Sequence, residues 1–303
     1  MKKIGVVGQG FVGGALTRGM MHAFDVHTYD KSGKYPIPGA TGYMSLSHLM
    51  EKMNGSSEFT GVYFICLPTP MYEDDGSADL TIVEGTLTQM SLMEGEKIAV
   101  VKSTVPPGSV ETWNKKFEGT GLKVIFNPEF LTEINADEDF KNQSRIVLGG
   151  PRPWINTVKE VFQTAFPDVP IVKTSSTTAE MVKYFTNVHL AARVVLSCEL
   201  WQVCQALDKA GGNIDYDKVQ EYASYDSRLG GSHMNVPGHD GVMGARGHCF
   251  PKDLNALISL AHQLDVSPTV MNAVWQKNME IVPDEHRDWE LMKGRAVSKK
   301  PTQ

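Results

Sequence analysis

The chain has 303 residues, of which 41% are hydrophobic and 21% charged, and its formal net charge is -6. Single domains commonly stop at about 100 to 200 residues, so this length predicts two domains. No apolar run approaches the roughly 18 residues that a membrane span needs. The acidic balance argues against a general nucleic-acid surface. The four cysteines lack paired spacing, so we expect neither a metal site nor a disulfide framework.

In its first half the chain alternates short apolar runs with helix-like segments. The runs cover residues 4–7, 26–29, 62–66, 98–101, 124–126 and 146–148, and residues 170–173 add one more. Successive apolar residues are typical of strands that are buried on both faces. The pattern therefore predicts an α/β fold with a doubly wound parallel sheet. The first run is too short for a signal peptide, so we interpret it as a first strand in a cytoplasmic protein.

After the sheet pattern the sequence becomes helical. Residues 174–178 offer N-cap side chains, and the segment from Ala179 to about Ala210 contains no proline, which predicts one long helix. Shorter helices follow to about residue 282, interrupted by a glycine-rich loop at 230–247. We therefore predict a sheet domain at 1–174, a helical domain at 175–285 and a basic tail at 286–303.

A glycine motif follows the first apolar run. Its glycines permit a tight turn from strand to helix and a close approach of pyrophosphate to the backbone. Asp30, at the end of the second strand, suits ribose hydroxyls and would repel a 2'-phosphate, so we expect NAD rather than NADP in a Rossmann-type domain. The alternative is a glycine-rich turn that binds nothing. The candidate cofactor contacts in the turn are Gly8, Gly10, Phe11, Val12 and Gly13.

A second motif, at residues 244–253, places Cys249 and Asp253 on one turn after a glycine-rich approach. Cys249 is the candidate nucleophile. Cys66, Cys198 and Cys204 lie in strand or helix patterns, so we interpret them as core residues. Asp253 is also a candidate N-cap for a helix at 254–264.

Three loops follow the third, fourth and fifth strands, at residues 67–70, 102–108 and 127–133. The carboxyl ends of parallel strands face one ligand crevice, so these loops can converge on one site. Lys183 and Asn187 are four residues apart on the long helix and therefore share a face.

With these residues assembled, the chain resembles the UDP-glucose dehydrogenase family of nucleotide-sugar dehydrogenases. The resemblance runs from the N-terminus to about residue 278, through the motifs above in the family's order. It implies a cytoplasmic enzyme of polysaccharide biosynthesis that oxidises a sugar primary alcohol to a carboxylate with two NAD molecules in turn.

The resemblance also implies roles for individual residues. Lys183 and Asn187 would handle the alcohol proton and the developing oxyanion, with a water held by Thr104 and Asp253. Cys249 would capture the aldehyde as a thiohemiacetal and then carry a thioester.

Further contacts follow from the same resemblance. Glu133 and Glu129 match carboxylates linked to thioester hydrolysis, and which of them activates water is left open. Thr69 and Thr104 are candidate cofactor contacts. The candidate substrate contacts are Phe130, Leu131, Glu133, Lys183, Asn187, Arg228, Gly244, Arg246 and Gly247.

Before its cysteine the chain departs from the family, which usually has Gly-Phe-Gly-Gly-Ser where this sequence has Gly-Ala-Arg-Gly-His. Arg246 should either point away from the sugar or add a charge to the ligand. Our hypothesis is that Arg246 and His248 help to hold an anionic substrate and favour the thiolate of Cys249.

The family usually continues into a third domain that grips the nucleotide, and residues 293–298 resemble the start of its first strand. We expect this third domain to be missing here. Three alternatives follow: the substrate binds in a more open site, another chain supplies the nucleotide contacts, or the substrate is a different one. Arg228 resembles a residue that reaches the neighbouring subunit's site, which implies a homodimer through the long helix; the alternative is an exposed surface arginine.

The resemblance favours UDP-glucose, with GDP-mannose the nearest alternative. A two-electron 3-hydroxyacid dehydrogenase shares the two-domain layout but does not need Cys249. A third alternative is a non-catalytic, NAD-binding partner of a longer chain.

Overall fold

The computed structural model describes residues 2–33, 37–54, 61–132 and 134–300. The chain forms two compact units. The first unit comprises Met1–Thr69 and Leu80–Lys183, and the second comprises Pro70–Asp79 and Tyr184–Gln303. The chain therefore leaves the first unit at residue 70, returns at residue 80 and leaves it again inside the long helix. No helix among the described residues combines the length and apolarity needed to cross a membrane.

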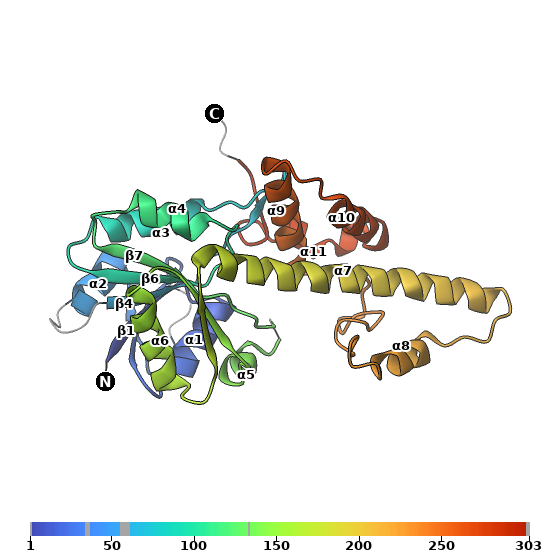
Figure 1. The fold of residues 1–303 in the computed structure, drawn as a ribbon, viewed down its shortest axis with the longest axis horizontal. Coiled ribbons are helices and arrows are strands. Elements are labelled where there is room, and N and C mark those ends of the chain that lie inside the picture. Colours follow the sequence, from blue (N-terminus) through green and yellow to red (C-terminus); the bar gives the residue numbers. More distant parts are fainter. Residues whose placement is uncertain (1, 34–36, 55–60, 133, 301–303) are drawn as a thin grey trace. The chain divides into compact units, whose positions relative to one another are not determined.

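One sheet forms the centre of the first unit (Figure 1). Its strand order is β3-β2-β1-β4-β6-β7-β8-β9. The strands are β1 (Lys3–Val7), β2 (Asp25–Tyr29), β3 (Thr41–Tyr43), β4 (Gly61–Ile65), β6 (Lys97–Val101), β7 (Leu122–Phe126), β8 (Ile146–Gly149) and β9 (Ile171–Thr174). The order reverses at β1, which lies between β2 and β4, and such a reversal is where open α/β sheets bind ligands.

The predicted doubly wound α/β fold is confirmed, with one difference. All pairs in the sheet are parallel except β7 and β8, which meet antiparallel at Phe126 and Gly149. The connection through α5 (Ala136–Lys141) returns to the sheet without the crossover that a parallel neighbour needs. β3 was not predicted, because it is short and not apolar.

Helices cover both faces of the sheet. On one face α1 (Phe11–Met20), α5 and α6 (Trp154–Ala165) share a core with alternate strand residues such as Val62 and Phe64. On the other, α2 (Leu46–Asn54), α3 (Thr81–Ser91) and α4 (Ser109–Lys116) pack on Tyr63 and Ile65. Burial on both faces explains why the strands are apolar at successive positions.

The predicted long helix is confirmed as α7 (Ser176–Lys209), which has 34 residues. It begins before Ala179 because the Ser175 hydroxyl accepts a hydrogen bond of 3.2 Å from the N–H of Thr178. Its first two turns belong to the first unit and the remainder to the second.

The second unit is mostly helical. Its helices are the later part of α7, α8 (Tyr216–Ser224), α9 (Phe250–Gln263), α10 (Thr269–Ile281), the 3-10 turn Asp284–His286 and α11 (Asp288–Leu291). The unit also has two short strands: β5 (Met71–Tyr72), which was not predicted, pairs in parallel with β10 (Val297–Ser298), which lies in the segment that resembles the start of a strand. The segment 293–298 resembles the start of a further domain. It ends in β10, which pairs with the segment 70–79 of the same unit.

The helix that was predicted at 254–264 begins earlier, which corrects the assignment of Asp253 as its N-cap. Cys249 occupies the N-cap position of α9, and Pro251 lies in the first turn, where proline is tolerated. The N–H of Asp253 donates 3.0 Å to the carbonyl of Cys249, so the two residues share the first helical turn.

Candidate active site

The glycine turn joins β1 to α1 in the first unit. Gly8 has φ +89°, and a Cβ on Gly13 would lie 1.9 Å from the carbonyl oxygen of Gly8. Only glycine allows strand and helix to approach so closely. A Cβ on Gly10 would meet no atom within 4 Å, so the surface above this residue is open. Phe11 and Val12 begin the helix at this surface. The turn therefore fits a group that must approach the backbone, such as a pyrophosphate.

Asp30 follows β2 at the same edge of the sheet. Its carboxylate accepts 2.7 Å from the N–H of Gln9, 2.8 Å from the N–H of Ser32 and 2.6 Å from the Ser32 hydroxyl. Burial would raise the pKa of Asp30, but these hydrogen bonds outweigh it and hold the pKa below its usual value. The carboxylate is therefore charged at neutral pH, as repulsion of a 2'-phosphate requires.

The loops after β4 and β6 are bound to each other. Ser103 donates 2.6 Å to the carbonyl of Leu67 and accepts 3.0 Å from its N–H. The Thr69 hydroxyl donates 2.7 Å to the carbonyl of Thr104. Both threonines are buried, so these two candidate cofactor contacts belong to one rigid pair of loops.

Lys183 brings α7 to the loop after β7. Its ammonium donates 2.7 Å to the carbonyl of Glu129 and 2.9 Å to the Glu129 carboxylate, and both side chains are buried. The N–H of Leu131 donates 2.8 Å to the same carboxylate, and the Phe130 ring lies 5.6 Å from the ammonium. Burial would raise the pKa of Glu129, but the charge and hydrogen bond of Lys183, the N–H of Leu131 and the charge of Lys102 together outweigh it and lower the pKa. The site therefore contains a fixed ammonium-carboxylate pair.

Two further buried polar groups were missed by the sequence analysis. Lys102 donates 2.7 Å to Asn127 Oδ1, and burial lowers its pKa to about 8. Glu180 on α7 accepts 2.6 Å and 2.8 Å from the N–H groups of Gly108 and Val110, at the start of α4. Glu180 is three residues before Lys183. This turn of α7 is therefore bound to the loop after β6 through Glu180 and to the loop after β7 through Lys183. The sequence signal that could have found Glu180 was its position shortly after the predicted N-cap residues of the long helix.

The second unit contains the candidate nucleophile. Cys249 is at the N-terminal end of α9, where helix N–H groups favour a negative charge. One turn later, Asp253 accepts 2.6 Å from the amide of Asn187 and 2.5 Å from the ammonium of Lys252. Lys252 was not among the predicted site residues, although it precedes Asp253 directly. The structure thus brings Asn187 and Asp253 together and adds a cation.

Residues 244–247 lead to the nucleophile and are held from several sides. Gly244 and Gly247 have φ of +88° and +74°, which suits glycine. Arg246 forms ion pairs with Asp240 and Asp288 within the same unit. The sequence left open whether Arg246 points away from the sugar or adds a charge to the ligand. These contacts with protein carboxylates fit the first orientation.

One predicted residue is not joined to these groups, and another cannot be placed. Arg228 is 88% exposed and pairs with Asp226 at 2.6 Å. Glu133 lies outside the described residues. All four cysteines lie within the described part of the chain, and none of them forms a disulfide. Cys198 and Cys204 are buried and Cys66 packs against the core of the sheet, as predicted.

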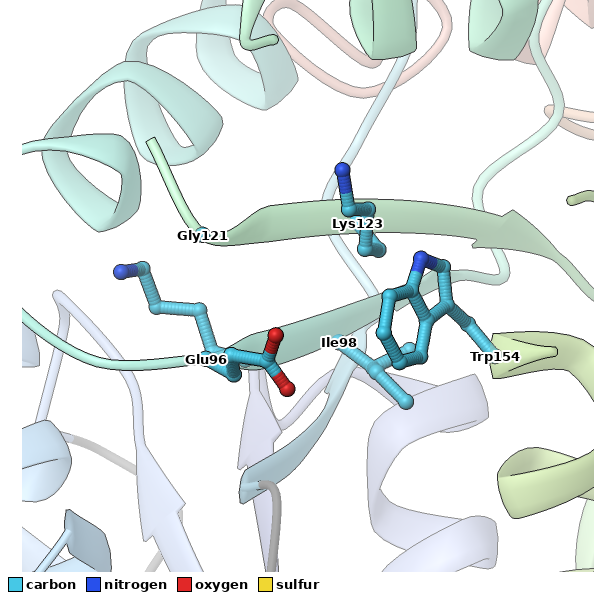
Figure 2. Close-up of a pocket in the computed structure, with 6 residues that line it drawn as sticks. Glu96, Ile98, Gly121, Lys123 and Trp154 are labelled. Carbon is cyan, nitrogen blue, oxygen red and sulfur yellow. The ribbon is translucent and has the colours of Figure 1, made fainter. Parts of the chain in front are cut away.

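A small pocket in the first unit lies at the amino ends of β6 and β7 (Figure 2). It encloses no space that could hold even a water-sized molecule, so it is a shallow depression and not a ligand pocket. The loops described above follow the carboxyl ends of the strands, so this pocket is not the candidate site. It is lined by Glu96, Lys97, Ile98, Gly121, Lys123 and Trp154.

Fold and motif together define a dinucleotide-binding α/β protein with an added helical unit. Two family models match it: the UDP-glucose/GDP-mannose dehydrogenase family NAD binding domain at residues 2–166 and the central domain of the same family at residues 177–280. The chain belongs to the UDP-glucose/GDP-mannose dehydrogenase family, and NAD is the cofactor of its first domain.

Individual relatives agree with this family. The chain is 32% identical over 235 residues to UDP-glucose 6-dehydrogenase AglM of Haloferax volcanii, covering 72% of this chain and 52% of that protein. It is 29% identical to UDP-glucose 6-dehydrogenase TuaD of Bacillus subtilis, covering 92% and 63%. A UDP-glucose dehydrogenase structure from Pyrobaculum islandicum matches with a TM-score of 0.77 and 28% identity, covering 92% and 68%. The chain therefore spans between about half and two thirds of these relatives' length.

Proposed function

We propose that this protein oxidises the primary alcohol of a nucleotide sugar to the carboxylate, with UDP-glucose as the substrate and UDP-glucuronate as the product. The observation that carries the proposal is Cys249 at the start of α9, with Asp253 one turn later bound to Asn187 and Lys252. NAD, when bound, accepts one hydride in each of two oxidations. Family membership supports this class of chemistry.

The side chains account for the remaining steps. Lys183, paired with Glu129, and Asn187, paired with Asp253, bind the alcohol oxygen and stabilise its negative charge as the proton and hydride leave. The Cys249 thiol adds to the aldehyde and gives a thiohemiacetal. Loss of a second hydride and a proton leaves a thioester. Water then cleaves the carbon-sulfur bond with a carboxylate, Glu129 or Glu133, as base, which releases the acid and restores the thiol.

Counting electrons tests this proposal. Purified protein, NAD and UDP-glucose should yield two NADH per sugar. C249A should slow acid formation by at least about 1000-fold, because no thioester can form. C204A, which removes a buried cysteine of α7, should leave the stoichiometry unchanged.

The same assay separates the alternatives. Two NADH with GDP-mannose but none with UDP-glucose would change the substrate. One NADH per substrate would indicate a two-electron hydroxyacid dehydrogenase, in which Cys249 has no role. No product with any nucleotide sugar, and no adduct on the Cys249 peptide, would favour a non-catalytic NAD-binding partner.

We also propose that the protein is a homodimer through α7 and acts in the cytoplasm, where thiols stay reduced. Leu196, Leu200, Val203 and Leu207 are all about half exposed and recur every three or four residues, which places them on one face of α7. Arg228 is exposed and would reach the partner's site. Sedimentation should give a dimer that L200E converts to a monomer. A wild-type monomer with full activity would rule out the shared site.

A further inference from the structure

Three of the four residues 244–247, which precede the nucleophile turn, have backbone groups bonded to side chains of the second unit. The N–H of Gly244 donates to Cys198 Sγ at 3.3 Å. Ala245 donates 2.8 Å to the side chain of Asn278 and accepts 3.0 Å from it. The N–H of Gly247 donates 3.1 Å to Asp288. This approach to Cys249 is therefore an ordered segment.

Arg246 makes the remaining contacts of this segment. Its guanidinium donates 2.6 Å to the Asp240 carboxylate and 2.8 Å to the carbonyl of His286, and it lies 3.3 Å from the Asp288 carboxylate. The side chain is only 15% exposed. Two carboxylates face one guanidinium, so the group has no surplus positive charge for an anionic ligand. The Arg246 cluster comprises Asp240, Arg246, Gly247, Asp288 and the His286 carbonyl.

Asp288 contacts both the side chain of Arg246 and the backbone of Gly247. One of its oxygens faces the guanidinium of Arg246, and the other accepts from the N–H of Gly247. Asp288 is the first residue of α11, and Asp240 belongs to a turn closed by the N–H of Gly238 and the carbonyl of Val242. The cluster therefore connects the segment before Cys249 to a turn on one side and to a helix on the other.

Gly247 explains why the backbone needs this support. Its φ of +74° is in the left-handed region, and a Cβ there would meet no atom within 4 Å. The conformation is thus not imposed by packing around the residue. The hydrogen bond from its N–H to Asp288 stabilises it, and Arg246 fixes the orientation of Asp288. Cys249 follows two residues later, at the N-cap of α9.

We propose that Arg246 is a positioning residue for Cys249: it orients Asp288 and thereby fixes the backbone from which the nucleophile turn begins. The residue acts through protein groups and does not bind the sugar nucleotide. This role rests on the proposed function, because it matters for turnover only if Cys249 is the nucleophile. It replaces our hypothesis that Arg246 holds an anionic substrate.

The test compares R246A, R246K and D288N with R287A as a matched control. Arg287 is 18% exposed and lies in the same unit, but its partners are Asp284, Glu290 and the carbonyl of Met279 rather than residues 244–247. Two measurements apply to every variant: hydrogen exchange of the peptide 244–250, and kcat and KM for UDP-glucose. Melting temperature records general loss of stability.

R246A and D288N should each raise exchange in the peptide by about tenfold, because both remove support from the Gly247 N–H. They should lower kcat by about tenfold and leave KM nearly unchanged, since a displaced nucleophile affects the transition state and not uniform binding. R246K should recover part of both effects, because an ammonium can contact a carboxylate without the guanidinium's fork. R287A should lower only the melting temperature.

Two results would overturn the proposal. A higher KM with unchanged kcat in R246A would make Arg246 a substrate contact. Unchanged exchange and kcat, with a melting temperature lowered as in R287A, would make the cluster merely structural. D288N keeps the shape of its side chain and so decides the question if R246A does not fold. If the wild type makes no NADH with any nucleotide sugar, the proposed function fails, while hydrogen exchange still tests the positioning role.

Discussion

Two successive polar residues on one face of α7 bind buried carboxylates in different ways. In the first unit Lys183 supplies the positive charge that Glu129 needs. In the second unit Asn187 supplies only an amide, and the charge for Asp253 comes from the adjacent Lys252. The first carboxylate therefore depends on the helix for its charge balance, whereas the second carries its counterion on its own helix. This difference predicts unequal effects of mutation.

The largest effect is expected from K183M. It leaves Glu129 buried without its counterion, which costs about 3 to 5 kcal/mol in other proteins. N187L removes one hydrogen bond from a carboxylate that is still paired, so it should cost about 1 to 2 kcal/mol. Urea unfolding of the protein without cofactor measures both. Equal losses would mean that Lys252 does not neutralise Asp253.

An intermediate effect is expected from D253N, which keeps the shape of the side chain and removes its charge. Lys252 is then left nearly buried without its carboxylate, at a cost of about 2 kcal/mol. K252M/D253N removes both charges and should be more stable than D253N alone, because the two changes are coupled. If the double variant is the less stable of the two, the lysine does not depend on Asp253 in the folded protein.

Glu180 is a third buried carboxyl, this time on α7 itself, and its hydrogen bonds come from the backbone N–H groups of Gly108 and Val110. Burial raises its pKa to about 7, although the N–H groups of Val110 and Gly108 oppose this, and Glu111 raises it further. Its folded pKa is above the unfolded value of 4.5, so its contribution to stability is present at low pH and is lost as pH rises from 4.5 to about 7.

The variant E180Q isolates this dependence, because glutamine cannot ionise. The stability of the wild type relative to E180Q should fall by roughly 2 to 3 kcal/mol between about pH 5 and about pH 8. Urea unfolding of both proteins at the two pH values measures it, and other titrating groups cancel in the difference. E111Q/E180Q against E111Q provides the control for the neighbouring carboxylate. A constant difference would show that Glu180 ionises as it does in the unfolded chain.

A feature of the fold could be predicted from the sequence when the interactions that form it are local, and not when they join residues far apart in the chain. Ile98–Val101 could be recognised as a strand because its apolar residues meet helices on both faces, and the glycine turn because its constraint is local. The pairing of β5 (Met71–Tyr72) with β10 (Val297–Ser298) joins segments that are far apart in the sequence, and neither strand is longer than two residues. Nothing in either segment alone could reveal it.

Within the site the same rule applies. Lys183 and Asn187 could be placed on one face because four residues complete about one helical turn. Arg246 was noticed as a departure, but its acceptors Asp288 and the His286 carbonyl come from a distant segment, so its orientation was left open. The start of α9 was misplaced because Asp253 is a good N-cap residue and Cys249 is not. Pro251 in the first turn was the signal for the earlier start.

The smallest loss of stability is expected from breaking an exposed ion pair, and it provides the reference for the losses at the buried pairs. Arg18 on α1 and Asp137 on α5 form a two-point contact, with bonds of 2.6 to 3.0 Å. Both side chains are 43% exposed. Water and salt screen such charges, so R18A should cost less than about 1 kcal/mol, and high salt should reduce even this. Urea unfolding at low and high salt measures it. A loss as large as that of K183M would mean that contact geometry, and not burial, determines what these ion pairs contribute to stability.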